Sequence, residues 1–480
     1  MTHFAYAQDD MALARRLHDS HTIFREAALT HRRFRHKDVL PLLNQLTSQP
    51  IFQVTQVGES VEKRSIHQVK AGSGPAKVLL WSQMHGDEAT ATMAMFDIFN
   101  FLQGKDDGFD DLRTTILNKT TLYFIPMLNP DGAERFQRRN ALDIDLNRDA
   151  LRTQSPEAII LKNLQQTLQP LVGFNLHDQN PRYSVGKTGK QAAITFLATA
   201  YDEDRSLNPV RERSMRLIVG MNRVLQQFIP GQIGRFDDEF EPRAFGDNIQ
   251  KWGTTLILLE SGGYANDPEK QYLRKLNFVA ILMALQAIAD QSYEKEAIEE
   301  YAAIPENGPH LFDVLIRNVQ INRNGANFTV DVGINRYEEN ACESQRSVRP
   351  FFYRSVVEDI GDLSIFNGLE EIDATGLQLV PARIHTGSLE TVNDLQKIDL
   401  EALRQEGVVV FRLSKAVKGE FPTDPVHLLT EGELPAQPLS VDQIPTFLLT
   451  DGTSIRHLCV NGFLQNSGET AVIRPNGIAE

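Results

Sequence analysis

Apolar residues in roughly the first 300 positions follow two patterns, short continuous runs and longer stretches with helical spacing. Short apolar runs are typical of strands buried on both faces, whereas apolar residues repeated every three or four positions indicate amphipathic helices. Buried strands are predicted at Val78–Trp81, Thr121–Ile125, Leu171–Leu176 and Thr254–Leu259. Because helical stretches separate these strands, we predict a mixed, mainly parallel α/β sheet with helices on both faces.

The predicted helices lie between the strands. Ser155-Pro156-Glu157 begins one of them with a capping residue, a proline at the first helical position and an early acid. Further helices are expected over Met215–Phe228 and Asp267–Ala289, and another follows Gly86. Phe52–Val57 and Ser65–Val69 alternate apolar and polar residues, which is typical of edge strands.

The pattern divides the chain into three parts. Residues 1–50 are predicted to be a helical segment that packs on the α/β domain, and their basic runs are interpreted as a solvated helix face. The α/β domain is assigned to residues 51–300. From about Tyr301 the pattern changes to short strands separated by Asp, Asn and Gly, so residues 301–480 are predicted to form a smaller β-rich accessory domain.

Composition narrows the classes of partner. The 480 residues carry 49 basic and 63 acidic side chains, a net charge of −14, which disfavours nucleic acid and anionic membranes as partners. Only two cysteines occur, Cys342 and Cys459, so neither a disulfide framework nor a thiolate zinc cluster is expected. The N-terminus lacks an apolar leader and no uninterrupted apolar run reaches membrane-spanning length, so we expect a cytoplasmic protein.

Three polar residues follow predicted strands: His85, His177 and Glu260. In open α/β sheets, ligands bind beyond the carboxyl ends of the strands, so these side chains are expected to converge. Glu88 lies three residues after His85, and a His-x-x-Glu of this kind occurs by chance about once in such a chain. Together with His177, however, the pair forms a His2Glu donor set, which predicts one catalytic zinc ion per chain.

The chemistry of such a site suggests a role for Glu260. Zinc lowers the pKa of bound water and polarises a carbonyl, and a general base must then carry the water's proton to the leaving nitrogen. The apolar neighbours Leu258 and Leu259 would raise the pKa of Glu260 towards the working range. Gly262 and Gly263 follow, and they are expected to let the backbone turn sharply so that the carboxylate faces a cleft.

A second cluster comprises Arg138-Arg139-Asn140 and Asp145-Leu146-Asn147-Arg148. One arginine beside a polarised carbonyl could stabilise an oxyanion, and another arginine with an adjacent asparagine could bind a substrate carboxylate. A surface ladder of salt bridges is the alternative interpretation. It is the weaker one because an exposed ladder has no need of Asn147.

These motifs together resemble the zinc carboxypeptidase superfamily of carboxypeptidase A type. The matching pieces, in the order of the family, are His85-Gly86-Asp87-Glu88, Asn129-Pro130-Asp131-Gly132, Arg138-x-Asn140, Asp145-Leu146-Asn147-Arg148, His177 and Glu260. They cover roughly residues 50–290. Several short motifs in a fixed order are a much more specific signal than any one of them.

The resemblance implies roles for individual residues. Zinc would be bound by His85, Glu88 and His177, with Glu260 as the general base. Arg138 would stabilise the oxyanion, with the adjacent Arg139 as the alternative. Asn147 and Arg148 would bind a terminal carboxylate, and Asp145 would hydrogen-bond to His85 and fix its ring.

The chain departs from the family at its mobile tyrosine, which has no clear counterpart before Glu260. Phe245 stands in that region and cannot donate a hydroxyl, and Tyr183, six residues after His177, is the other candidate. Substrate side-chain specificity is therefore left open.

The leading hypothesis is a zinc metallocarboxypeptidase, a hydrolase that cleaves a peptide bond next to a free C-terminal carboxylate. The alternative is an amide hydrolase for small N-acyl amino acids, similar to succinylglutamate desuccinylase or aspartoacylase. The substrate would accordingly be a peptide or a small acylated amino acid. A third hypothesis is a catalytically silent metal-binding scaffold, which the chemically competent residues at all four key positions disfavour.

Overall fold

The computed structural model describes residues 3–340, 351–414, 422, 424–430, 439–468 and 478–479, and Cys342 lies outside them. The chain forms two compact units: unit 1 comprises Met1–Gly186 and Lys190–Pro309, and unit 2 comprises Lys187–Gly189 and His310–Glu480. The change of sequence pattern predicted near Tyr301 thus falls close to the boundary between the two units at Pro309. The assignment of three domains stays a prediction.

Unit 1 is built on an eight-stranded sheet with strand order β1-β2-β4-β3-β5-β9-β7-β8. The strands are β1 Phe52–Glu59, β2 Ser65–Gly72, β3 Ala76–Trp81, β4 Thr120–Ile125, β5 Val172–Asp178, β7 Ile194–Leu197, β8 Ile233–Arg235 and β9 Thr255–Ser261. The central pairs β4/β3, β3/β5 and β5/β9 are parallel, and antiparallel strands flank them. The predicted mixed, mainly parallel sheet is confirmed. One detail is wrong: of the two strands predicted to lie at an edge, β1 does so, but β2 pairs on both sides.

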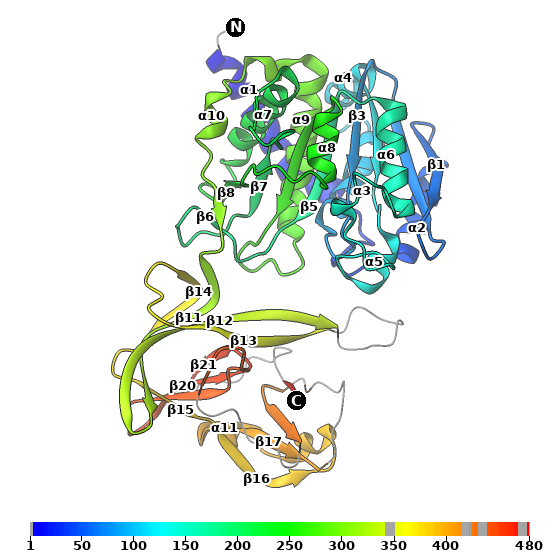
Figure 1. Ribbon diagram of the computed structural model, residues 1–480. Helices are drawn as coiled ribbons and strands as arrows, with labels where there is room; N and C mark the ends of the chain where they lie inside the picture. Colours follow the sequence, from blue (N-terminus) through cyan, green and yellow to red (C-terminus); the bar gives the residue numbers. More distant parts are fainter. Residues whose placement is uncertain are drawn as a thin grey trace. The chain divides into compact units, whose positions relative to one another are not determined.

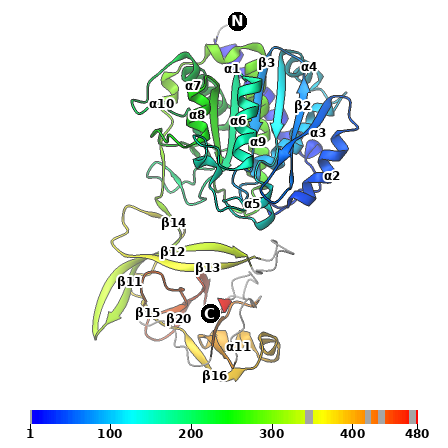
Figure 2. The same ribbon diagram turned by 45° about the vertical axis from the view of Figure 1, so that its right-hand side comes forward.

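Helices cover both faces of this sheet (Figures 1 and 2). The helices of unit 1 are α1 His3–Phe24, α2 His36–Leu46, α3 Thr90–Gln103, α4 Asp110–Lys119, α5 Pro130–Arg135, α6 Pro156–Leu168, α7 Pro209–Leu225, α8 Phe245–Lys251, α9 Gln271–Asp290 and α10 Glu299–Ala302. Alternate residues of the central strands enter different cores. Leu80 and Phe174 pack with residues of α1, α3, α7 and α9, whereas Leu79 and Trp81 pack with residues of α6 and α8.

The long helix α9 is apolar enough and long enough to cross a membrane by composition alone. Its most apolar stretch is 78% buried inside unit 1, however, which is the setting of a core helix. Arg274, Lys275 and Asn277 interrupt the helix, so it is not an uninterrupted apolar run of that length. Its apolar surface is covered by the protein itself.

The N-terminal segment forms α1 and α2, as predicted, but its basic run is not a solvated helix face. Arg33 and Arg35 lie in the connection between the two helices and are almost fully buried. The guanidinium of Arg33 stacks 4.1 Å from the ring centre of Phe136, and Arg35 pairs with Glu134 at 3.4 Å. These arginines fasten the segment to the region around α5.

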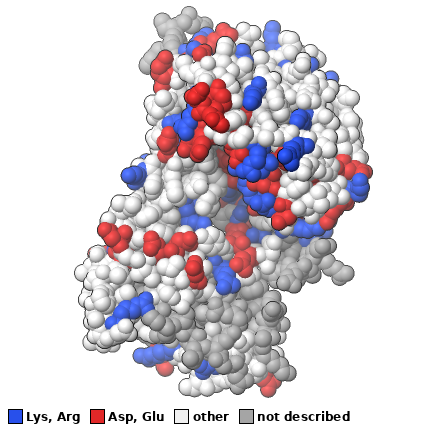
Figure 3. All heavy atoms as spheres, viewed as in Figure 1, with Lys and Arg blue, Asp and Glu red and all other residues white. Residues whose placement is uncertain are grey.

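On the face drawn in Figure 3, acidic and basic side chains of unit 1 are interspersed.

Unit 2 is rich in β structure, as predicted. One sheet has the order β13-β12-β11-β15-β19-β20-β21 with β14 beside β11, and a second has the order β16-β17-β18-β22. The strands are β11 Leu311–Arg323, β12 Ala326–Asn340, β13 Phe351–Gly361, β14 Asn367–Asp373, β15 Gln378–Pro381, β16 Arg383–Leu389, β17 Val408–Leu413, β18 His427–Thr430, β19 Phe447–Thr450, β20 Ile455–Val460, β21 Phe463–Asn466 and β22 Ile478–Ala479. Among the described residues of this unit, Leu400–Gln405 form the α-helix α11. The two short strands β6 Ser184–Val185 and β10 Asn307–Gly308 pair with each other in unit 1.

Candidate metal centre and active site

The segment that carries His85 and Glu88 is held between the ends of two parallel strands. After β3, the amide of Ser82 donates to the carbonyl of Ile125 at the end of β4 (3.1 Å), and that of Asn129 donates to the carbonyl of Gln83 (2.9 Å). Gly86 then passes so close to Gly132 that a Cβ on Gly86 would lie 2.0 Å from the carbonyl carbon of Gly132. Gly86 is therefore required by the close approach of two backbones, whereas a Cβ on Gly132 would lie 2.6 Å from Asn129 Nδ2 and 2.8 Å from the carbonyl oxygen of Arg139.

Asn129 links the same segment to Arg138. Its Oδ1 accepts from the amide of Gly132 (2.9 Å) and caps α5. Its Nδ2 donates to the carbonyl of Met84 (3.2 Å) and lies 3.3 Å from the carbonyl of Arg138 as a second acceptor. One buried amide side chain thus fixes the backbone beside His85 and beside Arg138 at the same time.

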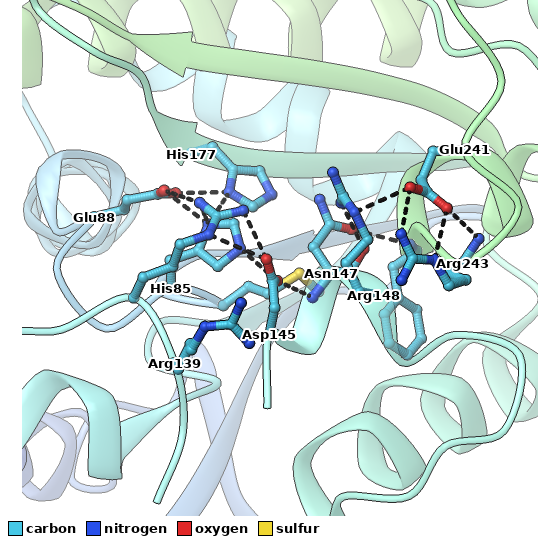
Figure 4. Close-up of polar contacts among 12 residues, drawn as sticks. His85, Glu88, Arg139, Asp145, Asn147, Arg148, His177, Glu241 and Arg243 are labelled. Atoms are coloured by element: carbon cyan, nitrogen blue, oxygen red, sulfur yellow. Dashed lines mark hydrogen bonds and ion pairs between the residues drawn. The ribbon is translucent and has the colours of Figure 1, made fainter. Parts of the chain in front are cut away.

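The three predicted metal ligands converge, as Figure 4 shows. His85 Nδ1 lies 2.7 Å from Glu88 Oε1, His177 Nδ1 lies 2.6 Å from Glu88 Oε2, and the two Nδ1 atoms lie 3.1 Å apart. All three residues are buried, and their ligand atoms lie within 4.8 Å of one another. The arrangement brings together residues 92 positions apart in the chain.

These residues fit a zinc ion by donor chemistry and by spacing. Two imidazoles and a carboxylate are the donor set of catalytic zinc sites, and ligand atoms about 2.0–2.1 Å from a tetrahedral zinc ion lie about 3.3 Å from one another. The two ring nitrogens lie near that separation, at 3.1 Å, and the two nitrogen–oxygen pairs lie closer together, at 2.6 and 2.7 Å. Arg138 Nη1 also lies 3.0 Å from His85 Nδ1 and 3.2 Å from Glu88 Oε1, so its guanidinium adjoins two of the three candidate ligands.

The electrostatics of the metal-free site are dominated by Glu88. Burial disfavours the charged form of this carboxyl, but the charges of His85 and His177 outweigh burial and lower its pKa below the usual range. Burial likewise lowers the pKa of His85, yet Glu88 and Asp145 overcome that effect and raise it to about 9. Burial lowers the pKa of His177. The metal-free site therefore holds an ionised Glu88, a protonated His85 and a neutral His177 near pH 7.

The ring of His85 is held from its far side by Asp145. Asp145 Oδ1 lies 3.1 Å from His85 Nε2 and also accepts from the amide of Asn147 (2.9 Å). Its other oxygen, Oδ2, accepts from Arg138 Nε (3.1 Å). Asp145 thus lies where a residue that orients the metal-binding face of His85 is needed.

The structure separates the two adjacent arginines. Arg138 points to Glu88 and Asp145, whereas Arg139 points away and donates from Nη1 to the carbonyl of Asp143 (2.9 Å). Of the two candidates for oxyanion stabilisation, Arg138 is therefore the one that lies at the site. Arg139 is half exposed.

Asn147 and Arg148 lie in η1 (Leu146–Arg148), which Asp145 caps. Asn147 Oδ1 accepts from the amide of Phe245 at the start of α8 (2.9 Å), and Arg148 is partly exposed. The pair therefore lies close to the metal ligands, joined to them through Asp145.

Glu260 lies on β9 directly opposite His177 on β5 in the parallel register, and it is partly buried. Burial, with the negative charge of Glu88 next, raises its pKa well above the usual range. The expected reason for Gly262 needs correction. Its φ is not positive, and a Cβ there would lie 2.0 Å from the carbonyl oxygen of Ala192, so close approach to a neighbouring segment explains the glycine.

Two residues near the candidate carboxylate-binding pair were not foreseen. Glu241 pairs with Arg148 at 3.2 Å, and Arg243 pairs with Glu241 at 2.9 Å. The sequence feature that could have indicated these two residues is the acidic run that ends at Glu241 and is followed by Pro242-Arg243. The candidate tyrosine Tyr183 packs edge-on against Phe236, with ring centres 5.9 Å apart, and Phe245 is fully buried in α8.

The fold and the donor set define unit 1 as an α/β zinc-binding domain. Residues 40–167 match the zinc carboxypeptidase family. This match confirms the resemblance carried by the motifs, and it includes His85, Glu88, Arg138, Asn147 and Arg148 but ends before His177 and Glu260.

Relatives with names from the same family match short stretches of the chain. Human carboxypeptidase D is 22% identical over 191 residues, covering 32% of this chain and 14% of its own length. A probable carboxypeptidase 2 of Arthroderma benhamiae is 25% identical over 161 residues, covering 33% and 28% respectively. The chain thus spans less than a third of the length of these curated relatives.

Solved structures are also similar. A metallo-carboxypeptidase from Burkholderia cenocepacia has a TM-score of 0.44 at 17% identity, covering 53% of this chain and 69% of its own. Thrombin activatable fibrinolysis inhibitor has a TM-score of 0.44 at 14% identity, covering 59% and 80%.

Proposed function

We propose that the chain is a zinc metallocarboxypeptidase, which hydrolyses the amide bond next to a free C-terminal carboxylate. The observation that carries the proposal is the convergence of His85, Glu88 and His177, with Glu260 facing His177 on the next strand. A metal centre and a carboxylate of raised pKa at the same edge of a sheet are the two parts that zinc-dependent hydrolysis needs.

When bound by His85, Glu88 and His177, zinc would polarise the scissile carbonyl and acidify a water molecule. Glu260 would accept the proton of that water and deliver it to the leaving nitrogen. Its raised pKa favours acceptance of the proton, because a more basic carboxylate holds a proton more strongly. Arg138 would donate hydrogen bonds to the oxygen on which negative charge develops.

Asn147 and Arg148 would hold the terminal carboxylate. An arginine binds a carboxylate through a charge-assisted contact that fixes both position and orientation. The pair is connected to the ligand His85 by Asp145, whose carboxylate contacts the ring of His85 and the amide of Asn147. The short segment from Asp145 to Arg148 therefore contains both the residues that would bind the substrate carboxylate and the residue that contacts the metal ligand His85.

The direct test is a panel of N-acylated dipeptides with free or amidated C-termini, together with small N-acyl amino acids, assayed with zinc-loaded protein. We expect free-acid peptides to be cleaved with a kcat/KM about 10–100-fold above that of their amides, the worth of one or two charge-assisted hydrogen bonds. Preference for N-acyl amino acids over peptides would contradict the proposal and support the amide-hydrolase alternative.

Two variants separate metal binding from proton transfer. Glu260→Gln should keep one zinc per chain and lose about 10³-fold in kcat, because a general base is removed while the ligands stay. His177→Ala should lose the zinc itself. Glu59→Gln and His67→Ala, which alter residues of β1 and β2, are the matched controls, and both should retain metal and activity. Retained activity in Glu260→Gln would refute the assigned base.

A further inference from the structure

The carboxylate of Glu241 lies between the guanidinium groups of Arg148 and Arg243, as Figure 4 shows. Its Oε2 lies 3.2 Å from Arg148 Nε and accepts from Arg243 Nη2 (2.9 Å), and its Oε1 accepts from Arg243 Nε (3.0 Å) and from the amide of Arg243 (3.1 Å). Arg243 therefore holds both oxygens, whereas Arg148 makes a single contact. A bidentate Arg–carboxylate pair is the more rigid of the two arrangements.

The backbone around Glu241 is fixed independently of Arg148. The amide of Glu241 donates to Asp247 Oδ1 (3.1 Å), and the amide of Ala150 donates to the carbonyl of Arg243 (3.1 Å). The amide of Phe245 donates to Asn147 Oδ1 (2.9 Å). Two hydrogen bonds thus join the segment before α8 to the loop that carries Asn147 and Arg148. Glu241 is therefore an acceptor in a fixed position, which the flexible Arg148 side chain can contact.

The contacts of Arg148 set the direction of its guanidinium. Nε faces Glu241, and Nη1 donates to the carbonyl of Asn147 (2.9 Å). Because the guanidinium is planar, contacts at these two nitrogens fix its plane. Nη2 takes part in neither contact. Its N–H groups therefore point in the direction that the guanidinium plane sets, and they can donate to a ligand.

Arg243 compensates the charge that Glu241 brings. Hydrogen bonds from Arg243 lower the pKa of Glu241, so its carboxylate is ionised at neutral pH. One carboxylate between two guanidinium groups leaves the three side chains with a net positive charge. Arg148 is thereby positioned without losing its attraction for an anion.

These arginines border a hollow that also has aspartates, among them Asp145, in its lining. The hollow has a volume of about 450 Å³, and its lining includes Arg139, Arg148, Arg243 and Asp145. Asp145 is also the residue that contacts His85 Nε2. Asp145 therefore connects the wall of this hollow to a ligand of the candidate metal site.

We propose that Glu241, fixed by Arg243, is a positioning residue that directs Arg148 towards the free carboxylate of the substrate. The inference rests on the proposed function, in which Arg148 binds that carboxylate. Glu241 makes no contact with the substrate in this role. It selects for free acids over amides by fixing the group that recognises them.

The test compares wild type with Glu241→Gln on a free-acid dipeptide and on its C-terminal amide. We expect KM for the free acid to rise about tenfold, kcat to change less than about twofold, and the amide kinetics to stay as in wild type. A fall in KM would mean that Glu241 competes with the substrate for Arg148, and it would overturn the proposal. Equal losses on both substrates with a lowered melting temperature would mean that Glu241 only supports the fold, and it would overturn the proposal as well.

Arg243→Gln provides a second, independent variant, because Arg243 is largely exposed and its loss should leave the fold intact. It should also raise KM for the free acid, since Glu241 loses its fixing contacts and its charge is no longer balanced. In the double variant the two effects should not add, because both act through Arg148. Additive effects would contradict the proposal that Arg243 acts on Arg148 through Glu241. Glu59→Gln, in an exposed pair with Lys63, is the charge-matched control.

A binding measurement separates failure of this inference from failure of the proposed function. Zinc-loaded wild type is titrated calorimetrically with N-acetylphenylalanine and with its amide. If wild type shows no preference for the acid, the proposed function fails, and this inference with it. If wild type prefers the acid and Glu241→Gln shows the same preference, only the inference is overturned.

Discussion

Asp145 Oδ1 lies 3.1 Å from Nε2 of His85, the ring nitrogen opposite the one that faces Glu88. This contact holds the ring so that Nδ1 presents its lone pair to the metal position, and the carboxylate makes the imidazole a stronger donor. We predict that Asp145→Asn weakens zinc binding about 10–100-fold, the usual effect of losing such a partner. Competition with a chromophoric chelator measures this directly.

The neighbouring Asp143 offers a matched control. Its side chain is almost fully exposed, and its φ of 59° is one that asparagine tolerates, so Asp143→Asn makes the same chemical change two residues away. It should leave zinc affinity unchanged. If the two variants weaken zinc binding equally, the effect comes from the net charge of the loop and not from the contact with His85.

Zinc binding should release a proton from His85. The pKa of His85 is raised to about 9 in the metal-free protein, so the ring is protonated at pH 6.5 and must lose its proton to coordinate. We predict release of about one proton per zinc at pH 6.5, against about one half for a histidine with the ordinary pKa of about 6.5. Below pH 9, affinity should therefore rise by about tenfold per pH unit as this proton becomes easier to remove.

Calorimetric titrations in buffers of different ionisation enthalpy count the protons. At pH 6.5 the ionisation of zinc-bound water, with a pKa of about 7, contributes less than at higher pH. Titrating Glu260→Gln removes the neighbouring carboxyl whose pKa is also raised, so that the count mainly reports His85. Release close to one half would show that Glu88 and Asp145 do not raise the pKa of His85. In Asp145→Asn the count should fall, because one of the two carboxylates that raise this pKa is lost.

The two histidine ligands and Glu260 could be predicted because each of them comes at or just after the end of a short apolar run. His177 and Glu260 end apolar runs that form adjacent parallel strands, and His85 follows a third such run. Parallel strands share their carboxyl edge, so residues far apart in sequence meet there. The close approach of Gly86 to the backbone of Gly132 could not be predicted in the same way, because it depends on how two separate loops pack.

The contacts that could not be predicted depend on packing between loops. Glu241 and Arg243 have no periodic pattern, and their meeting with Arg148 depends on hydrogen bonds from Ala150 and Phe245 that no local sequence specifies. Arg33 was interpreted as solvated because charged residues are usually exposed. Its burial against Phe136 is a tertiary contact between distant segments.

Helix α1 is fastened to unit 1 through a buried charged cluster around Asp97. Arg274 Nε donates to Asp97 Oδ2 (2.7 Å) and its Nη2 contacts Oδ1, while His21 Nε2 lies 2.7 Å from Oδ2. Asp97→Asn would leave the fully buried Arg274 without its counter-charge, so we predict a loss of about 3–5 kcal/mol in the free energy of unfolding. Urea unfolding followed by tryptophan fluorescence measures unit 1 alone, because both tryptophans, Trp81 and Trp252, lie in it.

The control for this substitution is Asp106→Asn, the same change at an exposed position with a φ of 58°. It should alter the unfolding free energy by less than about 0.5 kcal/mol. A similarly small effect in Asp97→Asn would show that the cluster does not fasten α1 to α3 and α9.

Asp247 makes the stability of unit 1 depend on pH. Burial raises its pKa to about 7, whereas the unfolded chain should have the ordinary value of about 3.9. Between these values the folded protein binds a proton that the unfolded chain does not, so the free energy of unfolding falls as pH rises and levels off above about pH 7. From pH 5 to pH 8 the loss from this group is about 2–3 kcal/mol.

Asp247→Asn removes this titration while keeping an oxygen that can accept from the amide of Glu241. The variant should therefore gain stability relative to wild type as pH rises from 5 to 8, and the gain should amount to most of the 2–3 kcal/mol estimated above. Other titrating groups are common to both proteins, so the difference between their urea midpoints isolates Asp247. A difference that is the same at pH 5 and pH 8 would mean that Asp247 is ionised in the folded protein at both, and that burial does not raise its pKa.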